Sequence, residues 1–301
     1  MSALLGVDHV SKRFGSQEVL RDVTFDVAAG EVVGLLGANG AGKSTLLRIV
    51  SKIDSADSGR ISGPAASETG AMIEPGWVDG RLSCADHVTL ALLTRGIRPT
   101  TARTSAELAR VGLAAATSKR AGRLSLGMRQ RLALCIATMH RPSLLVLDEP
   151  VNGLDPDGVL WVRDTIRRFA SNGGAVLLSS HLMAEMERVA DRVVVLSGGS
   201  LQEPDRASEW GSSANVAFTA DRDARRLAAP VEEAGGTLVC LDDRRGVVIG
   251  LSAEQVFAIA VRASVVLSRL TTETVSLEDH YRATIRLGRA TRDRTREQRR
   301  R

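Results

Sequence analysis

The residues best suited to chemistry form a glycine-rich segment, GANGAGKST at 37–45, which fits the pattern G-x-x-x-x-G-K-[ST]. Glycines allow backbone N–H groups to turn inward around phosphate oxygens. The N-terminus of a following helix, with its partial positive charge, points at the same anion. The lysine reaches the β and γ phosphates, and the next hydroxyl is a ligand for Mg²⁺. The residues expected to contact phosphate are Gly37, Asn39, Gly40, Ala41, Gly42, Lys43, Ser44 and Thr45.

Two carboxylates end the apolar run SLLVLDEP at 143–150. We expect Asp148 to hold Mg²⁺ with Ser44, directly or through water. Glu149 points elsewhere, where a carboxylate can orient or deprotonate the water that attacks a γ phosphate. Asp-Glu-Pro alone is common turn material. Together with the glycine-rich segment, however, the pair predicts a complete Mg·ATP site.

Alternating β and α patterns must position these groups. The strand EVVGLL at 31–36 leads into the glycine-rich segment, and a helix starts at about Lys43. The continuous apolar runs at 143–148 and 174–180 are typical of strands buried in a parallel sheet. We also expect strands over 4–10, 19–27 and 193–196, and helices over 83–111, 126–139 and 156–171.

The pattern changes near 203–205, and the residues beyond this point predict a small α+β unit. We expect a strand, a helix and two strands, then a helix and a strand, an order that suits a ferredoxin-like unit. Their ranges are 214–219, 221–234, 237–242, 246–250, 252–263 and 264–269. A last helix over 276–287 should run into an arginine-rich tail.

Three further motifs make the chain resemble the ATP-binding cassette (ABC) family, specifically the nucleotide-binding subunit of an ABC transporter. LSLGMRQR (124–131) is similar to the signature LSGGQ, VNGLDP (151–156) to the D-loop, and SSH (179–181) to the switch motif. The resemblance covers about residues 4–205. It implies a P-loop NTPase cassette with a RecA-like core, an antiparallel β subdomain and an α-helical subdomain at about 75–140. We therefore expect a cassette at 1–205, an accessory α+β domain at 206–285 and a basic disordered tail at 286–301.

The resemblance also implies roles for single residues. Glu149 and His181 would be catalytic, Phe14 would stack on adenine, and Asp155 would belong to the D-loop. His181 taken alone is an ordinary loop histidine, and Ser125 is a residue type that commonly caps helices. Capping is compatible with binding the γ phosphate held by a partner subunit. The signature residues that would face the partner's ATP are Ser125, Leu126, Gly127 and Met128.

The chain departs from the family pattern at three positions. Leu126 and Met128 replace Gly and Gln of the signature, and Glu74 stands at the Q-loop position in AMIEPGW. An ionised Glu accepts hydrogen bonds but cannot donate as Gln does, and we expect Glu74 to join Ser44 and Asp148 as a metal ligand. Similar variants occur in bacitracin- and drug-export ATPases, which favours export of an antibiotic, drug, peptide or lipid-like compound. Trp77 belongs either to the core or to the surface that meets a membrane partner.

The overall charge is concentrated at one end of the chain. The 301 residues carry 40 Lys and Arg against 35 Asp and Glu, or +5. Residues 282–301 hold nine Arg against Asp293 and Glu297, or +7, so the rest carries −2. The tail is therefore expected either to be solvated or to contact anionic lipid.

Composition also limits the location and the partners. Aromatic residues make up 3%, which is poor material for stacking on unpaired bases, and we expect no specific nucleic-acid partner. No apolar run is long enough to span a membrane, and three scattered cysteines favour a reducing cytosol. We expect a cytoplasmic protein, peripheral on the inner face of the cell membrane, bound to a separate transmembrane permease.

The expected mechanism uses two copies of the chain. ATP would lie between Lys43, Asp148 and Glu149 of one copy and Ser125 and Gly127 of the other. Loss of the γ phosphate would separate the copies, because it removes a shared contact. The Glu74 region and residues 75–123 would carry the motion to the permease.

Other functions remain open on the sequence. An ABC ATPase that acts on nucleic acid or ribosomes is favoured by the tail but opposed by the single cassette. A plain P-loop kinase or other NTPase is opposed by SLGMRQR and SSH. Residues 206–285 are either a ligand-binding module or a dimer contact.

Overall fold

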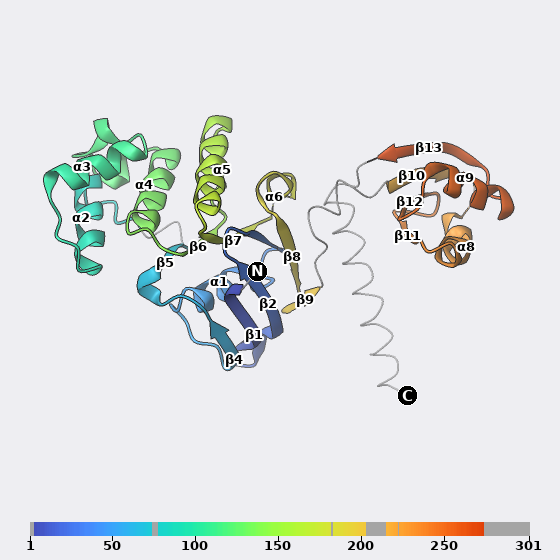
Figure 1. Cartoon of the computed structure of the whole chain (residues 1–301), viewed down its shortest axis with the longest axis horizontal. Helices are drawn as coiled ribbons and strands as arrows, with labels where there is room; N and C mark the ends of the chain where they lie inside the picture. Colours follow the sequence, from blue (N-terminus) through green and yellow to red (C-terminus); the bar gives the residue numbers. More distant parts are fainter. Residues whose placement is uncertain (1–2, 74–77, 182, 203–214, 222, 274–301) are drawn as a thin grey trace. The chain divides into compact units, whose positions relative to one another are not determined.

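The computed structural model describes residues 3–73, 78–181, 183–202, 215–221 and 223–273. The chain divides into two compact units, Met1–Pro204 and Asp205–Arg301 (Figure 1). Glu74, Trp77, the helix expected over 276–287 and the arginine-rich tail lie outside the described residues. Each unit is described by itself.

A six-stranded sheet forms the centre of the first unit, in the order β5-β6-β7-β3-β8-β9. Its first five strands are parallel, and β9 pairs antiparallel with β8. Every residue of β3 and β7 and the first four residues of β6 are buried, which confirms the strand predicted at 31–36 and those predicted from the continuous apolar runs at 143–148 and 174–180. The strands are β3 (Val32–Leu36), β5 (Thr69–Met72), β6 (Leu144–Asp148), β7 (Ala175–Ser180), β8 (Arg192–Ser197) and β9 (Ser200–Gln202).

A second, antiparallel sheet has the order β2-β1-β4. β1 (Ala3–Phe14) and β2 (Gln17–Ala28) form a hairpin that is longer than the two predicted strands. β4 (Ser58–Ser62) was not predicted, because SGRIS contains a single apolar residue and shows no period. One hydrophobic core joins this sheet, the central sheet and α1 (Lys43–Val50), through residues such as Val7, Leu47 and Val146.

Three helices form a group of their own beside the sheets (Figure 1). α2 (Cys84–Thr94), α3 (Thr101–Arg110) and α4 (Leu126–Thr138) share a core that includes Val88, Leu108 and Leu132. The range 83–111, predicted to be helical, holds two helices rather than one, because α2 ends before Gly96, whose φ is +67°. Two helices complete the first unit, α5 (Pro156–Ser171) and α6 (Met183–Val189), and Pro156 occupies the first turn of α5 as expected.

The second unit is a small α+β domain around one antiparallel sheet, in the order β11-β12-β10-β13. This strand order, with helices after the first and third strands, is that of a ferredoxin-like unit. The helix expected over 221–234 is a 3₁₀ turn at Ala224–Leu227 followed by a short α8, and the last strand starts at Leu267 rather than 264. The other elements are β10 (Asn215–Ala220), α8 (Ala228–Glu233), β11 (Thr237–Cys240), β12 (Arg245–Ile249), α9 (Ala253–Arg262) and β13 (Leu267–Glu273). Within the described residues of both units, no helix has the length and apolar character needed to cross a membrane.

Candidate nucleotide-binding site

The glycine-rich loop joins the buried strand β3 to the start of α1. Gly42 precedes this helix with a φ of +105°, and a Cβ there would lie 2.9 Å from both Leu20 Cδ2 and the Val19 carbonyl oxygen. Only glycine fits such a position without strain. Among the described residues no side chain caps α1, so the first N–H groups of the helix remain available to a ligand.

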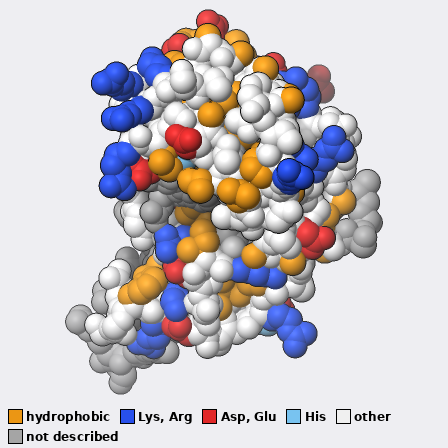
Figure 2. Space-filling view, turned by 90° about the vertical axis from the view of Figure 1, so that its left-hand side faces the viewer, with side chains coloured by type: hydrophobic (Ala, Val, Ile, Leu, Met, Phe, Trp, Pro, Cys, Tyr) orange, Lys and Arg blue, Asp and Glu red, His pale blue; other side chains and the backbone are white. Residues whose placement is uncertain are grey.

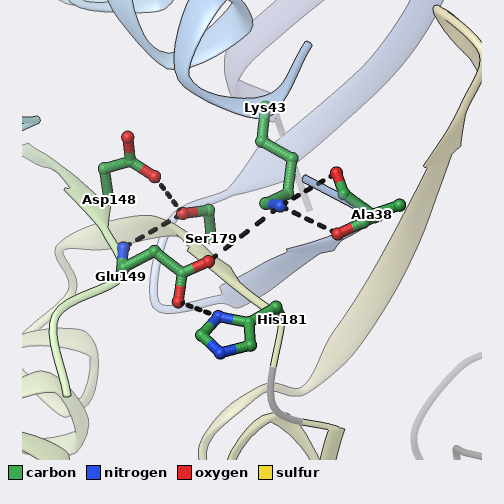
Figure 3. A network of polar contacts seen from close by, with 7 residues as sticks. Ala38, Lys43, Asp148, Glu149, Ser179 and His181 are labelled. Atoms are coloured by element: carbon green, nitrogen blue, oxygen red, sulfur yellow. Dashed lines mark hydrogen bonds and ion pairs between the residues drawn. The ribbon is translucent and has the colours of Figure 1, made fainter. Parts of the chain in front are cut away.

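Lys43 is the first residue of α1, and its side chain turns back over the loop (Figure 3). Its Nζ donates hydrogen bonds to the carbonyl oxygens of Gly37 (2.8 Å) and Ala38 (3.3 Å). The same Nζ lies 4.0 Å from Glu149 Oε1. The residue is only 7% exposed, so these oxygens, rather than water, surround its charge.

The two carboxylates stand at the carboxyl end of β6 and diverge (Figure 3). Asp148 Oδ1 accepts a hydrogen bond from the hydroxyl of Ser179 on the adjacent strand β7. Glu149 turns away at a φ of +48°, a left-handed conformation that is uncommon for a residue other than glycine. Its N–H donates to Ser179 Oγ at 3.0 Å. The divergence agrees with the different roles expected for the two side chains.

Glu149 links the lysine to the histidine of the SSH motif. Its Oε2 lies 2.8 Å from His181 Nδ1, and its Oε1 faces Lys43. The His181 side chain is 42% exposed, so the carboxylate lies at an open edge that a substrate can reach. A carboxylate held at such an edge has the geometry required of a general base.

An open hollow of about 430 Å³ contains most of the residues expected to bind phosphate. Ser44 and Asp148 both line it, and hydroxyl and carboxylate oxygens are the donors that Mg²⁺ prefers. The described residues contain no group of three His, Cys, Asp or Glu that could hold a metal alone. These two oxygens therefore fit Mg²⁺ that completes its shell with phosphates and water. The hollow is lined by Val19, Asn39, Gly40, Gly42, Lys43, Ser44, Thr45, Asp148 and Glu149.

Two predicted loop residues, Gly37 and Ala41, do not line this hollow in the described part of the chain. Gly37 contributes its carbonyl to Lys43 and packs closely on β8, since a Cβ there would lie 2.6 Å from the Leu196 carbonyl oxygen. Its place in the pattern therefore has a packing reason. Ala41 closes a turn in which its N–H donates to the Ala38 carbonyl at 3.1 Å.

The signature residues occupy the start of α4. The exposed Ser125 caps this helix, and its Oγ accepts a hydrogen bond from the Met128 N–H at 3.3 Å. Of the four signature residues, none lines the phosphate hollow as described, although Leu126 lines a neighbouring one of about 320 Å³ with Asp148 and Glu149. The structure therefore brings together the loop, both carboxylates and His181, but not Ser125.

The remaining predicted residues have these positions. Asp155 caps α5, with its Oδ1 accepting from the Gly158 N–H at 2.8 Å. Phe14 ends β1 with 51% of its surface exposed, and Lys12 Nζ lies 5.5 Å from its ring centroid. Glu74 lies outside the described residues, so its part in a metal site stays a prediction.

Two polar residues of this region lie inside the quoted motifs but received no role of their own from the sequence. Ser179 contacts both Asp148 and Glu149, and Gln130 Nε2 donates to the Pro150 carbonyl at 2.7 Å, joining α4 to the segment that carries the D-loop. The signal for Ser179 was present, because the apolar run 174–180 ends in two serines. Polar residues at the end of a buried strand require hydrogen-bond partners.

The parallel sheet, the glycine-rich loop and the adjacent carboxylates define a P-loop ATPase. A model of the family described as "ABC transporter" matches residues 20–152. The chain is 37% identical over 231 residues to the uncharacterized ABC transporter ATP-binding protein YdbJ of Bacillus subtilis, covering 68% of this chain and 72% of that protein. It is 28% identical to the bacitracin transport ATP-binding protein BcrA of Enterococcus faecalis, over 93% of this chain and 96% of the relative.

Solved structures show the same fold. One, described as the ATP binding subunit of an ABC transporter, matches 87% of this chain and 99% of its own at 25% identity and a TM-score of 0.62. Another, an ATP-binding cassette dimer in a post-hydrolysis state with ADP and Pi, matches 67% of this chain and 98% of its own at 20% identity and a TM-score of 0.62. The chain belongs to the ABC transporter family. It is an ABC-type ATPase with the ATP-binding cassette of that family.

Proposed function

We propose that this ATPase drives a separate membrane permease that exports an antibiotic, a drug, a peptide or a lipid-like compound. The observation that carries the ATPase part is the meeting of Lys43, Asp148, Glu149 and His181 at one edge of the sheet. The substrate class is supported by similarity to a bacitracin transport protein along nearly the whole chain. The direction is supported by 37% identity over 205 residues to the Nod factor export ATP-binding protein I of Rhizobium leguminosarum. The unusual Leu126 and Met128 favour the same class.

Within one site, each side chain has a task that follows from its position. Lys43 exchanges the Gly37 and Ala38 carbonyls for phosphate oxygens, while Asn39, Gly40 and the start of α1 supply N–H donors. Ser44 and Asp148 would hold Mg²⁺, and the bound ion would supply positive charge that offsets the charge of the phosphates. Glu149 accepts the proton of the attacking water, and His181 fixes the Glu149 carboxylate and contacts the γ phosphate.

The second half of the site comes from another copy of the chain. Ser125 is exposed at the start of α4 and does not line the phosphate hollow of its own chain. A second copy, joined head to tail, places this helix N-terminus and Gly127 against the γ phosphate. The resemblance to a cassette dimer supports this arrangement. Phe14, exposed at the end of β1, then stacks on adenine.

The permease contacts the helical group of the first unit. α2 exposes Leu90 and Leu93, which are neighbours on the helix surface, and clustered exposed apolar residues mark interaction sites. Figure 2 shows hydrophobic side chains gathered along a hollow, with Lys and Arg on either side. Contact at α2 links a permease to α4 through the core that these helices share.

The protein is peripheral on the inner face of the membrane, where the arginine-rich tail adds attraction to anionic lipid of about 1 kcal/mol per charge near the surface. Deleting residues 286–301 should weaken binding to anionic vesicles at low salt without changing ATP hydrolysis. If the deletion abolished ATP hydrolysis, the tail would instead be required for catalysis.

The decisive experiment identifies a neighbouring reading frame with about six hydrophobic spans and reconstitutes its product, as the permease, with this chain. The two proteins should co-purify from membranes, and candidate export substrates should raise ATP hydrolysis. The transport proposal would be overturned if the permease left the rate of ATP hydrolysis unchanged while RNA, bound through the tail, raised it.

A further inference from the structure

We propose that Ser179 is a positioning residue of the ATPase reaction, whose single hydroxyl holds Asp148 and Glu149 in their working places. The inference rests on the roles proposed above for these two carboxylates.

Ser179 lies opposite Asp148 in the parallel ladder between β6 and β7 and is fully buried. Its hydroxyl donates to Asp148 Oδ1 and accepts from the Glu149 N–H at 3.0 Å (Figure 3). A serine hydroxyl has one proton and two acceptor lone pairs, so its only proton is committed to Asp148. One side chain therefore contacts the group proposed to hold the metal and the backbone of the group proposed to activate water.

The backbone of Glu149 needs such support. Its φ of +48° is unfavourable for a side chain larger than glycine, and the following Pro150 restricts it further toward extended conformations. The Glu149 N–H meets two acceptors on Ser179, the hydroxyl and the carbonyl oxygen at 3.2 Å. These bonds offset the strain and fix the turn that separates the two carboxylates.

The turn determines where the Glu149 carboxylate lies. It ends between Lys43 Nζ at 4.0 Å and His181 Nδ1 at 2.8 Å. His181 stands two residues after Ser179, so one short segment holds Glu149 at both ends, by its N–H and by its carboxylate. Loosening the N–H end displaces the carboxylate from the water that it must activate.

A buried serine often has no role beyond satisfying its own hydrogen bonds, and the chain offers a control for that case. Ser51 is also buried, and within the described residues its Oγ has no hydrogen-bond partner. Removing the Ser51 hydroxyl therefore tests the loss of a buried oxygen remote from the carboxylates. Ser179→Thr keeps the hydroxyl and adds a methyl group, whereas Ser179→Cys keeps the shape with a larger sulfur atom and replaces a strong donor with a weak one.

The test measures steady-state ATP hydrolysis against ATP and Mg²⁺, ATP binding without Mg²⁺, and thermal melting. For Ser179→Ala we expect kcat to fall about 10- to 100-fold, as for other groups that orient metal ligands. We also expect the Mg²⁺ concentration that gives half-maximal hydrolysis to rise. ATP binding without Mg²⁺ should be unchanged. Ser179→Thr should recover most of the loss, Ser179→Cys little of it, and Ser51→Ala should match the parent.

Two results would overturn the inference. One is a Ser179→Ala enzyme whose kcat and Mg²⁺ dependence equal those of the parent. The other is a loss of activity that parallels the fall in melting temperature in all three Ser179 variants, with no change in Mg²⁺ dependence. That result would mean that Ser179 contributes only to packing. Asp148→Asn and Glu149→Gln are measured in parallel: if they hydrolyse ATP normally, the proposed site itself fails, whereas their loss beside an active Ser179→Ala removes only this inference.

Discussion

Two helix N-termini of the first unit share the partial positive charge of a helix start but differ in the residues around them. α1 starts after Gly42 without a side-chain cap in the described structure, and its Lys43 is buried in a loop of carbonyl oxygens beside Glu149. α4 starts at an exposed Ser125 that caps it and that lies outside the phosphate hollow. Both ends attract anions, yet only the α1 end lines the phosphate hollow with Asp148 and Glu149, whereas α4 borders a separate hollow beside the same carboxylates.

The difference indicates a division of work. Under the proposed function, the α1 end binds ATP within one chain, and the α4 end contacts a nucleotide that another chain presents. α4 also contacts the D-loop segment at two points. Gln130 donates a hydrogen bond to the Pro150 carbonyl. Leu126 packs so closely on Gly153 that a Cβ at position 153 would lie 2.6 Å from Leu126 Cδ2. The signature and the D-loop should therefore move together when two copies close.

The largest effect is expected from a substitution that removes the general base beside the N-terminus of α1. Glu149→Gln should lower kcat about 100- to 10,000-fold, the usual contribution of a general base, while ATP binding remains. Because ATP is then not consumed, the variant should accumulate as an ATP-bound dimer in light scattering. Glu233→Gln, an exposed change in the second unit, is the control. Normal turnover by Glu149→Gln would remove Glu149 from this role.

A smaller effect distinguishes capping from catalysis at α4. Ser125→Ala should cost about 1 kcal/mol of folding stability, as for other helix caps, and should also weaken ATP-dependent association. Ser252→Ala removes the matching side-chain bond from α9, where a capping box with Gln255 also forms, and should cost similar stability with no change in association. Equal association in both variants would leave Ser125 with capping only.

The smallest effect concerns the contact between the signature and the D-loop. Gly153→Ala should be less costly to stability in a Leu126→Gly background than in the parent, because the added methyl then meets no side chain. A double-mutant cycle on unfolding free energies should give a coupling of about 0.5 kcal/mol or more, as for residues in contact. Strict additivity would mean that the two segments are independent.

The α1 side was predictable because its pattern is local. The residues from Gly37 to Thr45 follow one another, and the apolar runs of β6 and β7 placed Asp148 and His181 at one sheet edge. The short strands β4 and β5 and the break after α2 carry weak patterns and were missed. The Ser179 contacts join residues about thirty positions apart, and only the pairing of β6 with β7 reveals them.

The most direct test of the shared site mixes two inactive variants. Lys43→Ala disables the α1 side, and Ser125→Glu places a negative charge at the α4 side. In a head-to-tail dimer of one copy of each, one site carries both defects and the other site carries neither. The account predicts that each variant alone hydrolyses almost no ATP and that the mixture regains hydrolysis. A mixture as inactive as its components would contradict a site built from two chains.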